Sequence, residues 1–121
     1  ATILSAGFCG MVESLKAAEQ LFAEGVKVRV LDMFTISPMD EAAVLDAAAN
    51  TGAIVTLDNH NKNGGIGSMV AEIIAGRSAV PFRRLGADSF GEVGTVDYLV
   101  EKFGVGSASV VKAVKELLGR A

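Results

Sequence analysis

Short apolar runs alternate with helix-patterned segments along the chain. Apolar and β-branched content predicts strands over residues 3–6, 26–31, 53–57 and 82–85. Helical spacing and capping residues predict helices over residues 11–24, 41–50, 68–74, 96–103 and from 107 onward. Strands that alternate with helices indicate right-handed βαβ crossovers. The pattern therefore predicts an α/β fold, a three-layer α/β/α sandwich around a mostly parallel sheet.

The first predicted helix places apolar residues at the spacing of one helical face. These residues are Met11, Leu15, Ala18 and Phe22. Gly25 is expected to end the helix, since glycine commonly follows a helix C-terminus. A turn is predicted over residues 7–10, between the first strand and this helix.

Composition limits the class of protein. The chain has 121 residues, of which 50% are hydrophobic and 21% charged, so we expect one folded domain over residues 1–121 and not a disordered segment. The net charge of −3 argues against nucleic acid as a partner. No apolar run reaches the roughly 18–20 residues of a membrane-spanning helix, so no membrane partner is expected. The single cysteine, Cys9, excludes an internal disulfide framework and favours a reducing, cytoplasmic setting.

Two further features suggest a larger context. The mean hydropathy of +0.43 is high for a small domain, and it fits a sheet buried on both faces or a surface covered by a partner. Ala1 leads directly into a strand-like run. We therefore expect the chain to be a fragment of a longer one.

Ligand sites in parallel α/β sheets lie at the carboxyl ends of the strands. Three predicted loops fall there, over residues 7–10, 58–67 and 86–95. The last loop has two interpretations: an interface or lid, or a long connector anchored by Phe90.

The middle loop contains the candidate site residues. They are Asp58, His60, Gly64, Gly65 and Gly67. Free backbone N–H groups at the start of the following helix could hold an anion or contact a partner. The glycines match neither the dinucleotide fingerprint nor the P-loop, so a tight strand-to-helix turn is the alternative interpretation.

His60 is the only histidine, and one interpretation pairs it as a base with Cys9 as a nucleophile. The alternative is that Cys9 packs as a small residue while His60 hydrogen-bonds locally or meets a partner subunit. One histidine, one cysteine and scattered carboxylates do not form a metal-ligand set. We therefore assign no catalytic, cofactor-binding or metal-binding residue to the chain.

Three stretches in order resemble one family. Residues 54–60 followed by 64–72 are similar to its "V-T-V-E-x-H … G-G-x-G-x-x-V-x-E" stretch, residues 36–40 to "I-K-P-L-D", and residues 85–94 to "L-G … D-x-F-G-x-S-G". This order resembles the C-terminal domain of the transketolase family, which includes deoxyxylulose-phosphate synthases and the β subunits of 2-oxo-acid dehydrogenases. His60 is closest to the transketolase branch. Asp58 replaces the usual Glu, a mild change, whereas Ser37 and Val93 replace a common Lys and Ser and put any role of those side chains in doubt.

The resemblance implies an enzyme that transfers two-carbon ketol units between sugar phosphates with thiamine diphosphate and Mg²⁺. In that family a Gly-Asp-Gly … Asn motif in another domain holds the cofactor, and this sequence contains no Gly-Asp-Gly. The chain is thus expected to support dimer or subunit assembly, in a single-chain or split enzyme, and to be inactive alone. The alternatives are a dehydrogenase β-subunit or deoxyxylulose-phosphate synthase domain, or a free-standing anion- or nucleotide-binding α/β module.

Overall fold

A four-stranded parallel sheet forms the centre of the computed structural model, which describes residues 1–120. The strands are β1 (Thr2–Ala6), β2 (Arg29–Asp32), β3 (Ile54–Asn61) and β4 (Phe82–Ala87). Their order across the sheet is β2-β1-β3-β4, and every neighbouring pair is parallel. The predicted parallel sheet is confirmed.

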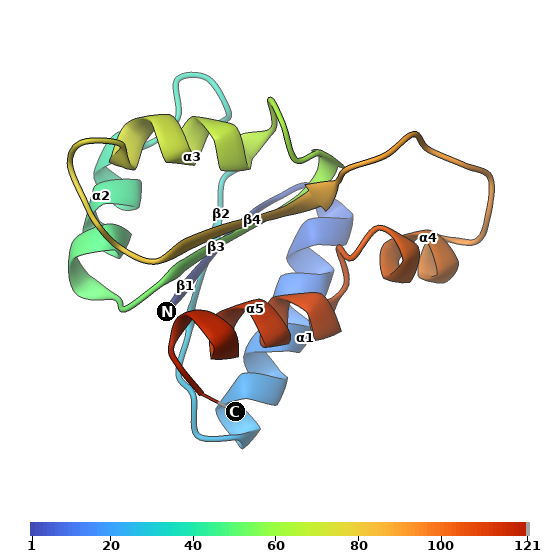
Figure 1. The fold of residues 1–121 in the computed structure, drawn as a ribbon, viewed down its shortest axis with the longest axis horizontal. Coiled ribbons are helices and arrows are strands. Elements are labelled where there is room, and N and C mark those ends of the chain that lie inside the picture. The colour runs from blue at the N-terminus through green and yellow to red at the C-terminus, as the bar shows by residue number, and fades with distance from the viewer. Residues whose placement is uncertain (121) are drawn as a thin grey trace.

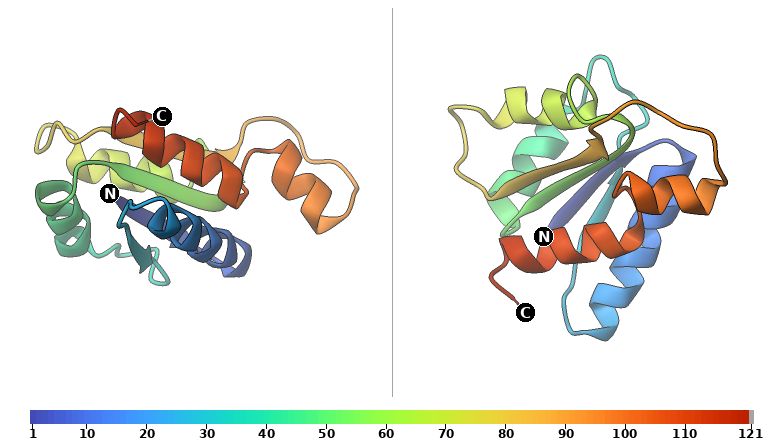
Figure 2. Two further views of the ribbon diagram at one scale, coloured as in Figure 1. Left: turned by 90° about the horizontal axis from the view of Figure 1, so that it is seen from below. Right: turned by 45° about the vertical axis from the view of Figure 1, so that its right-hand side comes forward.

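Helices cover both faces of the sheet (Figures 1 and 2). They are α1 (Phe8–Ala23), α2 (Glu41–Asn50), α3 (Ile66–Ile74), α4 (Val96–Lys102) and α5 (Ser107–Leu117). One face carries α2 and α3, the other carries α1 and α5, and α4 lies beside the sheet near the end of β4. This arrangement confirms the three-layer α/β/α sandwich.

Alternate residues of the central strands serve two separate cores. On β1, Leu4 packs in the core beneath α2 and α3, whereas Ile3 packs in the core beneath α1 and α5. On β3, Ile54 and Val55 divide in the same way. Because burying one such aliphatic side chain contributes about 1.5–3 kcal/mol, both helical layers are held by the apolar runs that predicted the strands.

α1 begins three residues earlier than its apolar spacing predicts. The predicted turn over residues 7–10 is wrong, because only Gly7 lies outside the helix, with φ of 79°. The Gly7 carbonyl accepts the first helical hydrogen bond from the Met11 N–H at 3.0 Å. One glycine in the left-handed region is enough to turn the chain from strand to helix.

The face that α1 buries consists mainly of small residues. The buried positions are Gly10, Ser14, Ala17 and Leu21. A Cβ atom on Gly10 would lie 2.6 Å from Ser5 Oγ, so the helix sits directly against the sheet. The apolar positions that predicted this helix are therefore not the ones that it buries.

β2 also differs from its predicted bounds, residues 26–31. The Val26 N–H donates to the Leu21 carbonyl at 2.8 Å, which ties the first of these residues to the end of α1. Pairing with β1 begins only at Arg29 and continues through Asp32.

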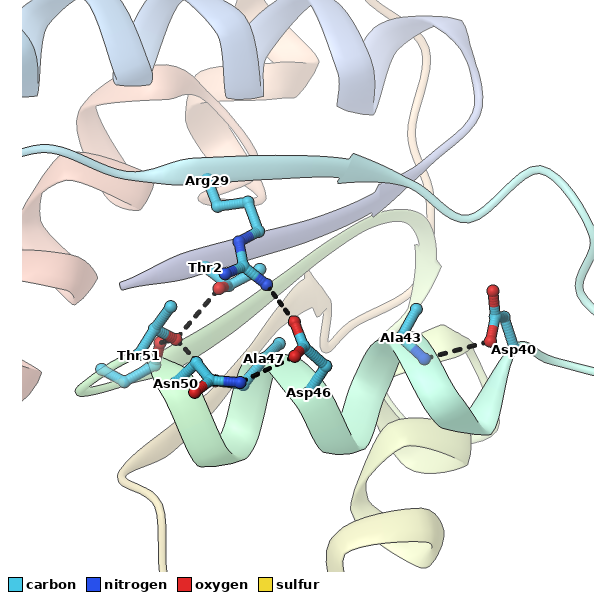
Figure 3. Close-up of polar contacts among 9 residues, drawn as sticks. Thr2, Arg29, Asp40, Ala43, Asp46, Ala47, Asn50 and Thr51 are labelled. Atoms are coloured by element: carbon cyan, nitrogen blue, oxygen red, sulfur yellow. Dashed lines mark hydrogen bonds and ion pairs between the residues drawn. The ribbon is translucent and has the colours of Figure 1, made fainter.

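α2 is fixed at its start and along its length by polar contacts (Figure 3). Asp40 caps the helix, because its Oδ1 accepts the Ala43 N–H at 3.0 Å. Asp46 receives a hydrogen bond from Arg29 of β2 at 2.6 Å, and this contact connects the helix to the edge of the sheet.

The C-terminal elements follow their predictions closely. β4 extends two residues beyond residue 85, to Ala87. Thr95 caps α4, its hydroxyl accepting the Tyr98 N–H at 3.3 Å, and Ser107 begins α5. Phe90, in the predicted loop over residues 86–95, is 98% exposed. The interpretation of this loop as a connector anchored by the Phe90 side chain is therefore wrong.

Candidate functional site

The predicted loop over residues 58–67 is partly strand. β3 continues through Asn61, which pairs with Ala87 of β4 after a register shift between Leu57 and Asn61. Asp58 and His60 therefore lie on the last part of a strand, and only residues 62–65 connect it to α3. This irregular strand end gives the connection its shape.

The Asp58 carboxylate is directed at the start of α3. Its Oδ2 accepts the backbone N–H of Ile66, the first residue of the helix, at 3.0 Å. A Cβ atom on Gly65 would lie 2.7 Å from the same oxygen, so only glycine fits at this distance. The acidic side chain thus satisfies one of the free N–H groups at the start of α3. Its negative charge also interacts favourably with the positive end of the helix dipole.

His60 is exposed and makes a local hydrogen bond. Its Nδ1 lies 2.7 Å from the Asn61 carbonyl oxygen. Because a carbonyl oxygen only accepts, Nδ1 is the donor in this contact. Local hydrogen bonding was one of the roles expected for this residue.

Arg84 of β4 forms hydrogen bonds with the short connection between β3 and α3. Its Nη1 donates to the Lys62 carbonyl and to Ser68 Oγ, each at 3.1 Å. Ser68 Oγ in turn accepts the Gly64 N–H at 2.9 Å. This role of Arg84 was not predicted from the sequence, where the only signal for it is an arginine that interrupts an apolar strand pattern.

Gly67 allows Arg84 to reach this position. A Cβ atom on Gly67 would lie 2.7 Å from both Arg84 Cγ and Thr56 Oγ1. At Gly64 the backbone and not the packing requires glycine, because φ is +86°, in the left-handed region. The glycines of the candidate loop are thus explained by a tight turn and close packing, while its role toward an anion or partner stays a prediction.

An open groove of about 440 Å³ lies beside this loop. It brings together parts of all three predicted loops, with Cys9 from α1, His60 from β3 and Glu92 from the loop before α4 among its lining residues. Apolar side chains of α4, including Leu99 and Phe103, complete its wall. The groove follows the position expected for ligand sites, the carboxyl ends of β1 and β3 where the strand order changes direction.

Cys9 and His60 share this groove without a hydrogen bond between them in residues 1–120. Within residues 1–120, no three His, Cys, Asp or Glu side chains lie close enough together to hold a metal ion. The donor groups of this part of the chain thus do not fit a Mg²⁺ centre. No helix within residues 1–120 is long and apolar enough to span a membrane.

The sequence profile of the transketolase C-terminal domain matches residues 1–110. The chain belongs to this family. Within the transketolase family, a 6-deoxy-6-sulfo-D-fructose transketolase subunit from Clostridium sp. (strain MSTE9) is 46% identical over 120 residues, covering 98% of this chain and 37% of the relative. The transketolase of Rattus norvegicus is 39% identical over 118 residues, covering 97% of this chain and 19% of that protein. The chain therefore spans well under half the length of these relatives.

Solved transketolase structures share the fold. A split-gene transketolase, described as an inactive beta4 tetramer, superposes with a TM-score of 0.91 at 36% identity, over 98% of this chain and 39% of its own. The transketolase of Leishmania mexicana gives a TM-score of 0.68 at 22% identity, which shows likeness of fold. The expected family and the C-terminal-domain fold are thus confirmed.

Proposed function

We propose that this chain is the C-terminal domain of a thiamine-diphosphate-dependent transketolase, with Mg²⁺ as the metal of the complete enzyme. The observation that carries the proposal is the family match over residues 1–110, together with relatives that are named transketolases. The complete enzyme would transfer a two-carbon ketol unit between sugar phosphates. Thiamine diphosphate supplies the carbanion chemistry when bound, and we place its site outside these 121 residues.

A second substrate is supported by one comparison. The relative named for 6-deoxy-6-sulfo-D-fructose is 46% identical to this chain. This identity is higher than the 39% of the Rattus norvegicus transketolase. We therefore propose this sulfo-sugar as a candidate donor beside the sugar phosphates. Both donors would release the same two-carbon unit, so one coupled assay can compare them.

The role proposed for the domain itself is assembly of the enzyme, through contacts with other domains or subunits and with a homodimer mate. Exposed apolar side chains support this role, among them Phe34 at 84% and Phe90 at 98% exposure, which follow the carboxyl ends of β2 and β4. The loop of Asp58, His60, Gly64, Gly65 and Gly67 is proposed as part of this contact region. The single cysteine supports a cytoplasmic setting.

The test compares the complete protein with the isolated chain. The complete protein should transfer ketol units from a sugar phosphate or from 6-deoxy-6-sulfo-D-fructose only with thiamine diphosphate and Mg²⁺ present. Titration calorimetry should detect micromolar cofactor binding to the complete protein and none to the 121 residues. Transfer without the cofactor, or tight cofactor binding by the isolated chain, would refute the proposal.

Two measurements separate the alternatives. Capture of the subunit-binding domain of a lipoyl acyltransferase would favour the 2-oxo-acid dehydrogenase branch. A free-standing anion-binding module predicts a clear rise in Tm with phosphate, whereas the assembly domain predicts little shift because Asp58 already occupies the Ile66 N–H.

A further inference from the structure

The connection between β3 and α3 contains the dipeptide Asn63-Gly64, the one place in the 121 residues where an asparagine precedes a glycine. Both residues are exposed, and neither belongs to a strand or a helix. The backbone nitrogen of a glycine can approach the side-chain amide carbon of the asparagine before it, because glycine has no Cβ atom in the way. Nothing lies within 4 Å of a Cβ atom built on Gly64, so neighbouring groups leave room for a ring to close at this point.

The other asparagines of the chain precede backbone nitrogens that belong to regular structure. The nitrogen after Asn50 donates its hydrogen to the Ala47 carbonyl at 3.1 Å, and the nitrogen after Asn61 donates to the Ala87 carbonyl at 2.8 Å. Asn59 lies within β3. Their side chains are therefore held beside a fixed backbone, whereas Asn63 is not.

We propose that Asn63 is a site of deamidation in the folded protein. The Gly64 nitrogen loses its proton to solvent and bonds to Cγ of Asn63, and the side-chain nitrogen takes up a proton and leaves as ammonia. Water then adds to either carbonyl carbon of the resulting succinimide ring, which opens to aspartate or to isoaspartate. The reaction consumes one water and releases one ammonia, so it requires no oxidant and no enzyme.

Ser68 and Arg84 restrain this reaction. Ser68 Oγ accepts the Gly64 N–H at 2.9 Å, so the proton that must leave is held and the nitrogen is oriented toward the serine. Arg84 Nη1 donates to the same Oγ at 3.1 Å and, more weakly, to Asn63 Oδ1 at 3.5 Å. The two groups that must meet are thus bound to one pair of side chains, and these hydrogen bonds have to open before the ring can form. The fold therefore sets the rate at which Asn63 reacts.

The products would change the connection in two ways. A carboxylate at position 63 would draw the Arg84 guanidinium away from Ser68, because hydrogen bonds between charged groups are stronger than those to a neutral hydroxyl. In the isoaspartyl product the side-chain methylene becomes part of the main chain, which lengthens a connection that consists only of residues 62–65. The contact of Asp58 with the Ile66 N–H depends on the shape of this connection. Deamidation would thus alter the candidate loop irreversibly and without a ligand.

The test is peptide mass spectrometry of the complete protein after incubation at alkaline pH, both folded and unfolded in urea. Mass spectrometry detects a carboxylate in place of each asparagine amide, and chromatography separates aspartate from isoaspartate. Position 63 should react first among the asparagines of this chain, and about tenfold more slowly in the folded protein, where ordinary hydrogen bonds must open. The proposal is overturned if the folded protein keeps an intact Asn63 when the unfolded protein has reacted completely, or if Asn59 or Asn61 reacts as fast.

A pair of serine variants tests the restraint. Ser68→Ala should recover most of the difference between the folded and the unfolded rate at Asn63. The matched control is Ser78→Ala, because Ser78 is also half-buried and its Oγ accepts a backbone N–H, that of Val80, at 3.1 Å in another loop. This control should leave the rate at Asn63 unchanged.

Circular dichroism verifies that both serine variants fold, and Asn63→Gln, which would need a larger ring, should give no product at position 63. Equal rates in Ser68→Ala and Ser78→Ala would show that Ser68 does not restrain the reaction. Because the readout is the mass of a peptide, it stands whether or not the complete protein transfers ketol units.

Discussion

Glu13 of α1 accepts the backbone N–H of Ser107, 94 residues later in the chain, at 2.9 Å. Ser107 is the first residue of α5, whose preceding Gly106 has no side chain with which to cap the helix. A carboxylate from a neighbouring helix thus does the work of a capping residue. This hydrogen bond joins the first and last helices of the fold.

Removal of the Glu13 carboxylate should destabilise the domain. We expect Glu13→Ala to lower the free energy of unfolding by about 1–2 kcal/mol, the usual effect of losing a helix cap. The matched control is Glu19→Ala, an exposed glutamate of the same helix, which should change it by less than about 0.5 kcal/mol. Urea unfolding of the two variants and the native chain measures the difference, and equal losses would contradict the capping role.

The Glu13 carboxylate should make the free energy of unfolding depend on pH in the acid range. Desolvation raises the pKa of Glu13, but hydrogen bonds from Lys16 and Ser107 outweigh it and leave the pKa below its ordinary value. A lowered pKa in the folded state means that this contribution is complete above about pH 5 and is lost as the pH falls through the folded value. Unfolding of Glu13→Gln should therefore vary less with pH below 5 than that of the native chain. Identical pH profiles would exclude Glu13 as a source of acid sensitivity.

Gly67→Ala should destabilise the domain although alanine favours helices. The new Cβ atom would lie 2.7 Å from Arg84 Cγ and from Thr56 Oγ1. Overpacking of this kind costs about 1–3 kcal/mol, more than the roughly 1 kcal/mol that alanine gains in helix propensity. Gly91→Ala is the control, because nothing lies within 4 Å of its added Cβ. Thermal unfolding of both variants decides the sign, and a stabilised Gly67→Ala would show that the arginine can move aside.

Arg84 should set the rigidity of the connection between β3 and α3. Without its guanidinium, the Lys62 carbonyl and Ser68 Oγ each lose a donor at 3.1 Å. We expect Arg84→Met to speed amide hydrogen exchange at Gly64, whose N–H donates to Ser68 Oγ. Arg83→Met, which breaks only the contact with Glu116 on the opposite face, should leave that amide unchanged. Equal exchange in the two variants would refute this role.

The sequence predicted the layers of the fold better than the faces of its helices. The strands through Ile54 and Ile3 were predicted from apolar content, because a central parallel strand is buried on both sides. The buried face of α1 was not, because the small residues Gly10 and Ser14 let the helix lie close to the sheet but carry no hydrophobic signal. Periodicity found the exposed line of that helix instead.

The candidate site was predicted only in part for a related reason. Asp58 and the glycines could be placed at a strand end from spacing alone. Arg84 could not, because its contacts depend on β4 lying beside β3, a long-range pairing that local sequence does not contain. The groove shared by Cys9 and His60 likewise depends on strand order.

Both outer strands of the sheet present arginines where another sheet would have to pair. Arg29 of β2 is bound to Asp46 of α2, and Arg83 of β4 is bound to Glu116 of α5. Charged residues on outer strands oppose the edge-to-edge pairing that leads to aggregates. The two edges of the described sheet therefore carry their own protection against pairing with the sheet of another molecule.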